Sequence, residues 1–148
     1  MKHLSVPAKI EHLEEVLSFA ESEMQSVDTD KKTQYSLNTV IEEIFVNIAS
    51  YAYPSDTSFT SNASLARLYE GEVTISISVD AGMFIVEFRD EGIPYNPLAK
   101  ADPDITLSAD EREIGGLGII MVKKLMDDVR YEHRDGCNIL TISVRIEN

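Results

Sequence analysis

Cysteine is almost absent from this sequence, and tryptophan is absent altogether. Among 148 residues there is one cysteine, Cys137, so no internal disulfide can form. No group of Cys and His residues has the spacing of a metal-binding motif. These absences exclude a disulfide-bonded scaffold and a zinc fold, and they indicate a reducing compartment, so we expect a cytoplasmic protein.

Basic residues are also scarce. The chain has 13 Lys and Arg residues against 26 Asp and Glu residues, which gives a formal charge of −13. This charge repels the phosphate backbone of nucleic acids and anionic lipid surfaces over about a Debye length. No apolar run approaches the roughly 18 residues that suggest a membrane span. We therefore expect neither nucleic acid nor a membrane as a partner.

Two segments have the three-and-four spacing of apolar residues that marks one face of a helix. The first predicted helix runs from Pro7, which suits a first turn, to about Val27. Its apolar face consists of Ile10, Leu13, Leu17, Ala20 and Met24. The second predicted helix runs from about Lys32 to Ala52. Its apolar face consists of Leu37, Ile41, Ile44, Phe45, Ile48 and Ala52.

Two later parts of the chain alternate apolar and polar residues, the period expected for strands. Residues 73–79 and 84–88 predict the strands of one hairpin, and residues 129–134 and 138–146 predict those of a second. The second pair flanks Asp135-Gly136, a dipeptide that favours a tight hairpin turn because both residues tolerate positive φ.

The order of these elements predicts the fold. A third apolar helix, from about Leu117 to Asp127, separates the two hairpins, and residues 55–71 lack periodicity, which predicts a loop insertion. The order of helix, helix, hairpin, long loop, helix and hairpin predicts an α+β two-layer sandwich with a mixed, mostly antiparallel sheet and helices on one face. A chain of this length suits one domain, so we expect a single domain over residues 1–148.

Glu43 and Asn47 are the first candidate site residues. They lie one turn apart on the second predicted helix, on the side opposite Ile41, Phe45 and Ile48, whereas Glu42 points about a quarter-turn away. The pair can present a carboxylate and an amide to a ligand. It can equally be part of an ordinary solvated helix face.

Asp90 and Gly92 are the second candidates, because Asp90-Glu91-Gly92 ends a predicted strand where a ligand can approach. Asp and Gly are also the commonest turn formers, so a plain turn is the alternative.

Three glycines, Gly115, Gly116 and Gly118, stand at the start of the third predicted helix. Glycine lets backbone N–H groups approach a phosphate, and the helix adds its positive dipole end. A simple helix-start turn would use the same residues. The segment lacks the Gly-x-x-x-x-Gly-Lys of a P-loop and does not follow a strand, which excludes a Walker or Rossmann site.

In their order and spacing these segments resemble the GHKL ATPases, the superfamily that includes histidine kinases and DNA gyrase. Residues 40–49 (VIEEIFVNIA) look like its N-box, residues 90–94 (DEGIP) look like its first glycine box, and residues 115–118 (GGLG) look like its second. Within the superfamily, the chain most resembles the anti-sigma-factor serine/threonine kinases of bacteria. The segments 123–129 (KKLMDDV) and 135–141 (DGCNILT) are similar to theirs.

The resemblance implies that ATP and Mg²⁺ are bound. In the pattern of the family, Asn47 would coordinate Mg²⁺ and Glu43 would act as the general base towards a hydroxyl. Asp90 would accept a hydrogen bond from the adenine amino group, and Gly92 would let the chain pass close to the base. Thr141 resembles the threonine that helps to hold the adenine.

The same resemblance implies how the phosphates are held. Backbone N–H groups at Gly115, Gly116, Leu117 and Gly118 would approach them, and residues 96–114 would form a lid. Arg112 is a candidate for a lid residue that reaches the phosphates, and a solvated arginine is the alternative.

The family also implies partners: an anti-anti-sigma-type protein that is phosphorylated, a sigma factor that is bound, and a second copy of the chain in a homodimer. Pro94 departs from the family pattern Asp-x-Gly-x-Gly, and a proline makes this loop more rigid because it fixes φ and removes an N–H. The alternative function is a non-catalytic, nucleotide-gated protein-interaction module. Pro94 favours the module, whereas Glu43 and Asn47 together favour the kinase.

Overall fold

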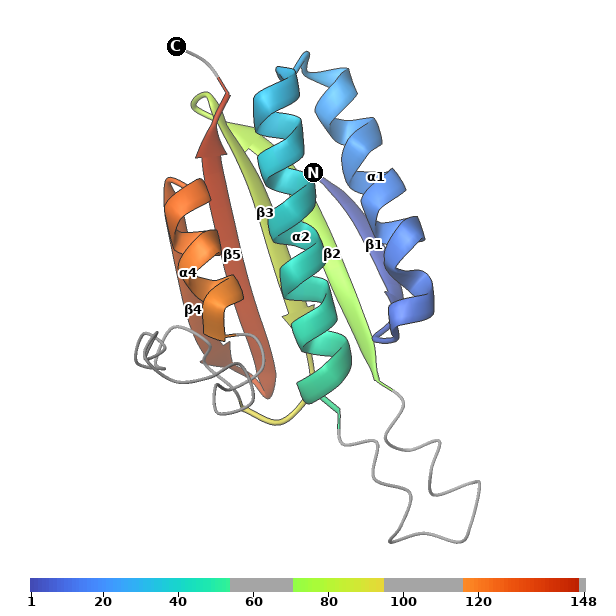
Figure 1. Ribbon diagram of the computed structural model, residues 1–148. Helices are drawn as coiled ribbons and strands as arrows, with labels where there is room; N and C mark the ends of the chain where they lie inside the picture. Colours follow the sequence, from blue (N-terminus) through green and yellow to red (C-terminus); the bar gives the residue numbers. More distant parts are fainter. Residues whose placement is uncertain (54–70, 95–115, 147–148) are drawn as a thin grey trace, which may run out of the picture.

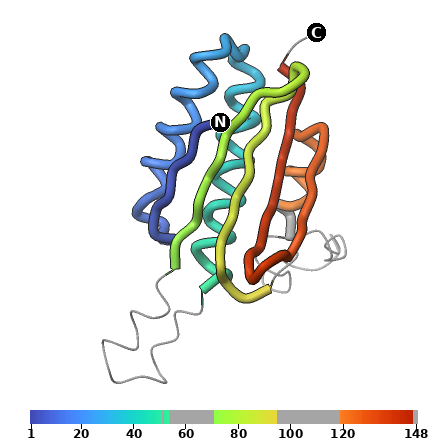
Figure 2. The backbone as a smooth tube through the Cα atoms, turned by 180° about the vertical axis from the view of Figure 1, so that it is seen from behind, coloured from blue at the N-terminus to red at the C-terminus, as the bar shows by residue number. Residues whose placement is uncertain are grey.

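A computed structural model describes residues 1–53, 71–94 and 116–146 of the chain. Helices α1, α2 and α4 lie side by side on one face of a five-stranded sheet (Figure 1), and the opposite face carries no helix from the described residues (Figure 2). The elements, in order, are β1 (Lys2–Pro7), the short helix η1 (Ile10–His12), α1 (Leu13–Ser26), α2 (Lys31–Tyr51), β2 (Glu72–Asp80), β3 (Met83–Asp90), α4 (Gly116–Leu125), β4 (Asp128–Arg134) and β5 (Cys137–Arg145).

The predicted α+β sandwich is confirmed, with one refinement of the sheet. Its strand order is β1-β2-β3-β5-β4, and every neighbouring pair is antiparallel. Both hairpins turn through two residues of positive φ: Ala81 (52°) and Gly82 (78°) in the first, and Asp135 (54°) and Gly136 (78°) in the second. Positive φ at both central positions matches the twist of the flanking strands, which is why the predicted Asp-Gly turn forms here.

The prediction for the N-terminus is wrong. Residues from Pro7 onward were expected in a helix, but Lys2–Pro7 is strand β1, and the long helix begins only at Leu13. The strand pairs with β2, where Val6 stands opposite Val73 and is only 2% exposed. Pro7 is tolerated because it ends an edge strand, where a missing N–H leaves no ladder bond broken.

The second predicted helix is confirmed as α2, within one residue at each end. Asp30 caps it, because its carboxylate accepts a 2.7 Å hydrogen bond from the Thr33 backbone N–H. The third predicted helix is α4, which begins one residue before and ends two residues before the expected bounds.

The core lies between the helices and the sheet. Each layer supplies large side chains that are fully buried: Met24 from α1; Leu37, Ile41 and Phe45 from α2; and Ile75, Phe84, Phe88 and Ile142 from the strands. Burial of one such side chain contributes roughly 1.5–3 kcal/mol. The same packing holds α2 over β2 and β3 (Figure 1). The site described next lies between α2, α4 and the strands β3, β5 and β4.

Candidate functional site

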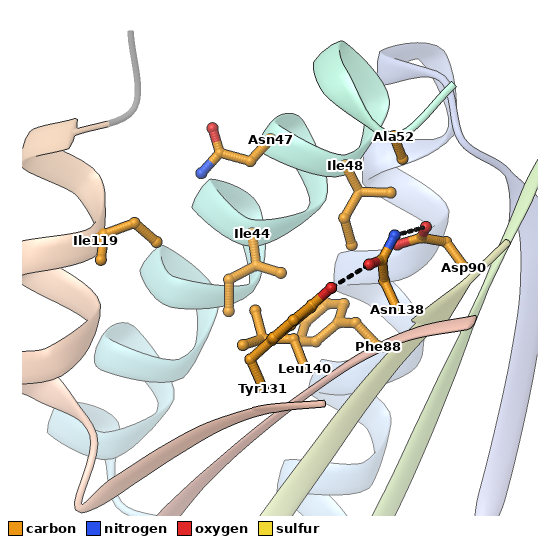
Figure 3. Close-up of a pocket in the computed structure, with 10 residues that line it drawn as sticks. All are labelled: Ile44, Asn47, Ile48, Ala52, Phe88, Asp90, Ile119, Tyr131, Asn138 and Leu140. Carbon is orange, nitrogen blue, oxygen red and sulfur yellow. Dashed lines mark hydrogen bonds between the residues drawn. The ribbon is translucent and has the colours of Figure 1, made fainter. Parts of the chain in front are cut away.

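A cavity opens between α2, α4 and the strands β3, β5 and β4 (Figure 3). It is mostly apolar, with Asp90, Asn138, Asn47 and the Tyr131 hydroxyl as its polar groups. Its lining residues are Ile44, Asn47, Ile48, Ala52, Phe88, Asp90, Ile119, Tyr131, Asn138 and Leu140. Apolar walls with a few polar groups are typical of a small-molecule site.

Asp90, the last residue of β3, is a buried carboxylate in this cavity and is only 5% exposed. Its Oδ1 atom accepts two hydrogen bonds, one from the Gly92 backbone N–H at 2.9 Å and one from Asn138 Nδ2 at 3.0 Å. Its Oδ2 atom accepts none from the described residues. An ionised carboxylate oxygen that accepts no hydrogen bond from the described residues is free to accept one from a ligand, so Oδ2 is the atom of Asp90 that a ligand donor could reach.

The surroundings raise the pKa of Asp90 above its ordinary value. Burial is the main cause, because it disfavours the charged form. The hydrogen bonds from Asn138 and Gly92 and the nearby His133 act in the opposite direction. Ionisation of this carboxyl group is therefore more costly than in water, and shifts of this kind are frequent in functional sites.

Gly92 is required by the packing of the loop after β3. An added Cβ would lie 2.1 Å from the backbone oxygen of Ala52, at the end of α2. That oxygen accepts a 2.8 Å hydrogen bond from the Ile93 N–H. Gly92 thus allows the chain to pass close to the end of α2. The resemblance had implied a different role, in which Gly92 lets the chain pass close to the adenine base.

Tyr53 ties the same loop to the sheet. Its hydroxyl donates to the Glu72 carbonyl and accepts from the Glu91 N–H, both at 2.7 Å. Burial raises the pKa of Tyr53 above its ordinary value. The end of α2 and the loop after Asp90 are therefore joined by side-chain and backbone hydrogen bonds.

Asn138 and Tyr131 belong to the site although the sequence analysis did not identify them. Asn138 Nδ2 donates to Asp90, and the Tyr131 hydroxyl donates to Asn138 Oδ1 (Figure 3). One signal was available: Asn138 stands at a position of the last strand that alternates with Leu140 and Ile142 on the inner face, where an asparagine is unusual.

Thr141 does not line the cavity, contrary to the expectation for this residue. The resemblance implied a role in holding adenine, but successive residues of a strand point to opposite faces of the sheet. Asn138 and Leu140 line the cavity, so Thr141 lies on the face that carries no described helix. The residue of β5 that reaches Asp90 is Asn138 instead.

Glu43 and Asn47 lie together on α2, as expected, with Asn47 Nδ2 donating to Glu43 Oε1 at 3.4 Å. Asn47 is half-buried and lines the cavity beside Ile44, so it does not belong to a solvated helix face. The reason is that α4 lies next to α2 and faces this flank of the helix (Figure 3). Glu42 is exposed, in agreement with its predicted rotation.

The expected phosphate-binding glycines are only partly described. Gly116, Leu117 and Gly118 form the first turn of α4, and Ile119, the next residue, lines the cavity. The helix N-terminus, with its positive dipole end, therefore lies at the cavity. Gly115, the expected lid at 96–114, with Arg112, and all but Gly71 of the expected insertion at 55–71 lie outside the described residues.

Among the described residues, no group of three or more His, Cys, Asp or Glu side chains is placed so that it could hold a metal ion. Within the same residues, no helix is long and apolar enough to span a membrane.

The antiparallel sheet, the helices on one face and the cavity at the end of α2 define a nucleotide-binding fold of the histidine-kinase type. The histidine kinase-like ATPase domain family matches residues 6–144, and the chain belongs to this family.

Curated relatives are anti-sigma factors and serine/threonine kinases. The chain is 26% identical over 112 residues to the serine/threonine-protein kinase BtrW of Bordetella bronchiseptica. The matched segment covers 76% of this chain and 70% of that protein. It is 25% identical over 96 residues to the anti-sigma F factor of Bacillus subtilis, covering 65% of this chain and 58% of that factor. The chain thus spans less than two thirds of the length of some of these relatives.

Solved structures agree on the fold. The RsbU and RsbW domains of a Mycobacterium tuberculosis protein match with a TM-score of 0.64 at 14% identity, covering 100% of this chain and 33% of that one. The catalytic domain of the histidine kinase ThkA matches with a TM-score of 0.53 at 12% identity, and the match covers 99% of this chain and 98% of that domain.

Proposed function

We propose that the cavity binds ATP and that the chain is an anti-sigma-factor-like serine/threonine protein kinase. The observation that carries this proposal is Asp90, which lines a mostly apolar cavity: one carboxylate oxygen is held by two protein donors, and the other accepts no hydrogen bond from the described residues. Adenine suits such a cavity because it is a flat ring with one exocyclic amino group. The amino group would donate to Asp90 Oδ2.

The phosphate end of the nucleotide is assigned to α4 and Asn47. The first turn of α4, with Gly116, Leu117 and Gly118, offers backbone N–H groups to an anion. Asn47 Nδ2 is engaged by Glu43, which leaves the amide oxygen as the atom able to ligate Mg²⁺. When bound, Mg-ATP supplies the phosphoryl group together with the cation that neutralises its charge.

Glu43 is proposed as the general base. It is half-buried, and its carboxylate is fixed next to Asn47, the proposed Mg²⁺ ligand. In this position Glu43 would accept the proton of a serine or threonine hydroxyl of a partner. The hydroxyl oxygen would bond to the γ-phosphorus of ATP while the bond from that phosphorus to the bridging oxygen breaks and ADP leaves. A positioned base contributes typically 10²–10⁴-fold to the rate, and the rest comes from positioning and electrostatics.

The names of the relatives support the proposed partners. Anti-sigma F factors and protein kinases are among them, which supports a sigma factor as a bound partner and an anti-anti-sigma-type protein as the phosphorylated one. A fold neighbour, with a TM-score of 0.55, was solved as the SiaB-SiaC complex of Pseudomonas aeruginosa. We also propose a homodimer in the cytoplasm.

A nucleotide-gated interaction module is the second candidate. The loop before Pro94 is pinned, because the Ile93 N–H donates to the Ala52 carbonyl and the Ile93 carbonyl accepts from Asn138 at 2.8 Å. A rigid loop holds the base but moves little with turnover, which favours a pocket that senses nucleotide rather than consuming it.

Phosphate transfer decides between the two. The purified chain is incubated with labelled Mg-ATP and an anti-anti-sigma-type protein encoded beside it, and nucleotide affinity is measured by calorimetry. Binding together with transfer to the partner is the expected result. Binding without transfer to any such partner would support the module, and no binding would overturn both.

A further inference from the structure

A chain of hydrogen bonds crosses three strands behind the cavity. The Tyr131 hydroxyl on β4 donates to Asn138 Oδ1 on β5, and Asn138 Nδ2 donates to Asp90 Oδ1 on β3 at 3.0 Å (Figure 3). The same Nδ2 also reaches the carbonyls of Ile93, at 2.8 Å, and Gly92, at 3.4 Å. One side-chain amide thus holds both the carboxylate and the loop that follows it.

The strand register builds this arrangement. Asn138 stands directly opposite Asp90 in the β3–β5 pair, and Tyr131 stands opposite Leu140, which places it diagonal to Asn138. Directly opposed and diagonal side chains on one sheet face are within reach of each other. Asn138 is only 6% exposed, and a buried amide destabilises a fold unless it is hydrogen-bonded.

We propose that Asn138 and Tyr131 are positioning residues that set the base selectivity of the cavity, an inference that rests on the proposed binding of ATP. With Oδ1 of Asp90 occupied by Asn138 and the Gly92 N–H, Oδ2 is directed to the ligand purely as an acceptor. An acceptor there selects a purine with an amino group at its 6-position and rejects one with a carbonyl. Tyr131 acts through Asn138, because its donation orients the amide with the nitrogen towards Asp90.

Without Asn138, the carboxyl group of Asp90 keeps one donor, the Gly92 N–H, and is free to rotate about its last side-chain bond. Losing a donor to the charged form also favours protonation of a carboxyl that burial already disfavours as an anion. A rotated or protonated carboxyl group can donate as well as accept. The cavity would then accept either purine, and its preference would shrink.

A purely structural role of the network makes a different prediction. If Asn138 only satisfies buried groups, its replacement weakens every nucleotide by the same factor or lowers stability, and the ratio between two nucleotides stays constant. The ratio of affinities therefore separates the two roles, whereas the affinity for ATP alone does not.

The test compares ATP with inosine triphosphate, which has a carbonyl in place of the amino group. Dissociation constants of both, with Mg²⁺, are measured by calorimetry for the full chain and for Asn138→Leu, Tyr131→Phe and Ser143→Ala. Leucine has nearly the shape of asparagine without the amide. Ser143 is the matched control, because it also lies on β5 but on the opposite face of the sheet.

We expect the wild-type chain to prefer ATP, and this preference to fall by about tenfold in Asn138→Leu, the worth of roughly one hydrogen bond to a charged group. Tyr131→Phe should lower it by a smaller factor, and Ser143→Ala should leave it unchanged. If Asn138→Leu does not fold, Tyr131→Phe decides. Wild-type binding of ATP with an unchanged ratio in the folded variants would overturn the inference alone. Absence of ATP binding in the wild-type chain would overturn the proposed function and the inference with it.

Discussion

Replacing Asp90 by asparagine is the sharpest perturbation of the proposed site. The substitution keeps the shape of the side chain and one acceptor oxygen. That oxygen would stay with the Gly92 N–H and Asn138 Nδ2, because both are donors and would repel an amide nitrogen. The new NH₂ group would then take the place of Oδ2 and face the cavity. In the proposed complex it would confront the adenine amino group, donor against donor.

The loss of ATP affinity can be estimated from the one hydrogen bond that the substitution removes. A hydrogen bond to a charged group is worth roughly 1.5–3 kcal/mol, which corresponds to about a 10- to 150-fold increase in the dissociation constant for ATP. Inosine triphosphate should be affected in the opposite direction, because its carbonyl can accept from the new amide. We expect Asp90→Asn to reverse the preference between the two nucleotides.

Asp90→Asn should not lower folding stability, although it should lower the affinity for ATP. Because burial raises the pKa of Asp90, the folded state binds its proton more tightly than the unfolded state does. The contribution of this group to stability is therefore complete below its unfolded pKa and is lost as the pH rises through the folded pKa. At neutral pH the ionised carboxylate destabilises the fold, so the neutral amide should leave the free energy of unfolding unchanged or increase it.

Calorimetry with both nucleotides and urea unfolding at pH 7 measure the two effects. Glu87→Gln is the matched control, because it removes the same charge from β3 on the opposite face of the sheet, three residues earlier. An Asp90→Asn variant with unchanged affinity for ATP and unchanged nucleotide preference would refute the reasoning and return Asp90 to the role of a turn residue.

Glu43→Ala should leave Mg-ATP affinity within a few-fold and lower phosphate transfer by about 10²–10⁴, with exposed Glu42→Ala as the control; equal transfer by both variants would remove Glu43 as the base. Asn47→Ala should lower binding and transfer together, and excess Mg²⁺ should partly restore them, as a titration of Mg²⁺ will test. Gly92→Ala should lower the urea midpoint, because its Cβ would overlap a backbone oxygen at 2.1 Å; a midpoint equal to that of wild type would contradict this contact. ATP affinity should fall as the pH drops through the raised pKa of Asp90, and calorimetry from neutral to acidic pH should detect this loss in the wild-type chain but not in Asp90→Asn.

Elements with local signals were predictable from the sequence. The apolar stripe of α2 and the Asp-Gly turn between β4 and β5 each lie within a short stretch of chain. Strand β1 was not predictable in the same way, because its six residues include only two inward apolar ones, Leu4 and Val6. Its pairing partner β2 lies some 70 residues away in the sequence. Long-range pairing of this kind leaves little trace in local periodicity.

The same limit applies to the site. Asp90 and Asn47 could be proposed because they lie in short motifs, and both line the cavity. Asn138 and Tyr131 depend on the register of β3, β5 and β4, which brings three separate segments together. The error at Thr141 has the same origin, because a strand residue one position away from the correct parity points to the other face.

The acidic charge of the chain bears on how the phosphate end of the cavity, at Asn47 and α4, differs from the base end, at Asp90. The chain has a formal charge of −13, and none of the described residues that line the cavity is Lys or Arg. Within the described residues, an anionic nucleotide would therefore receive no side-chain cation at the cavity, and Mg²⁺ and the N-terminus of α4 are the groups that these residues leave for its phosphates. The base end contributes apolar contacts and one oriented carboxylate. Substitutions at Asp90 should therefore change which base is chosen, whereas substitutions at Asn47 should change how binding depends on Mg²⁺.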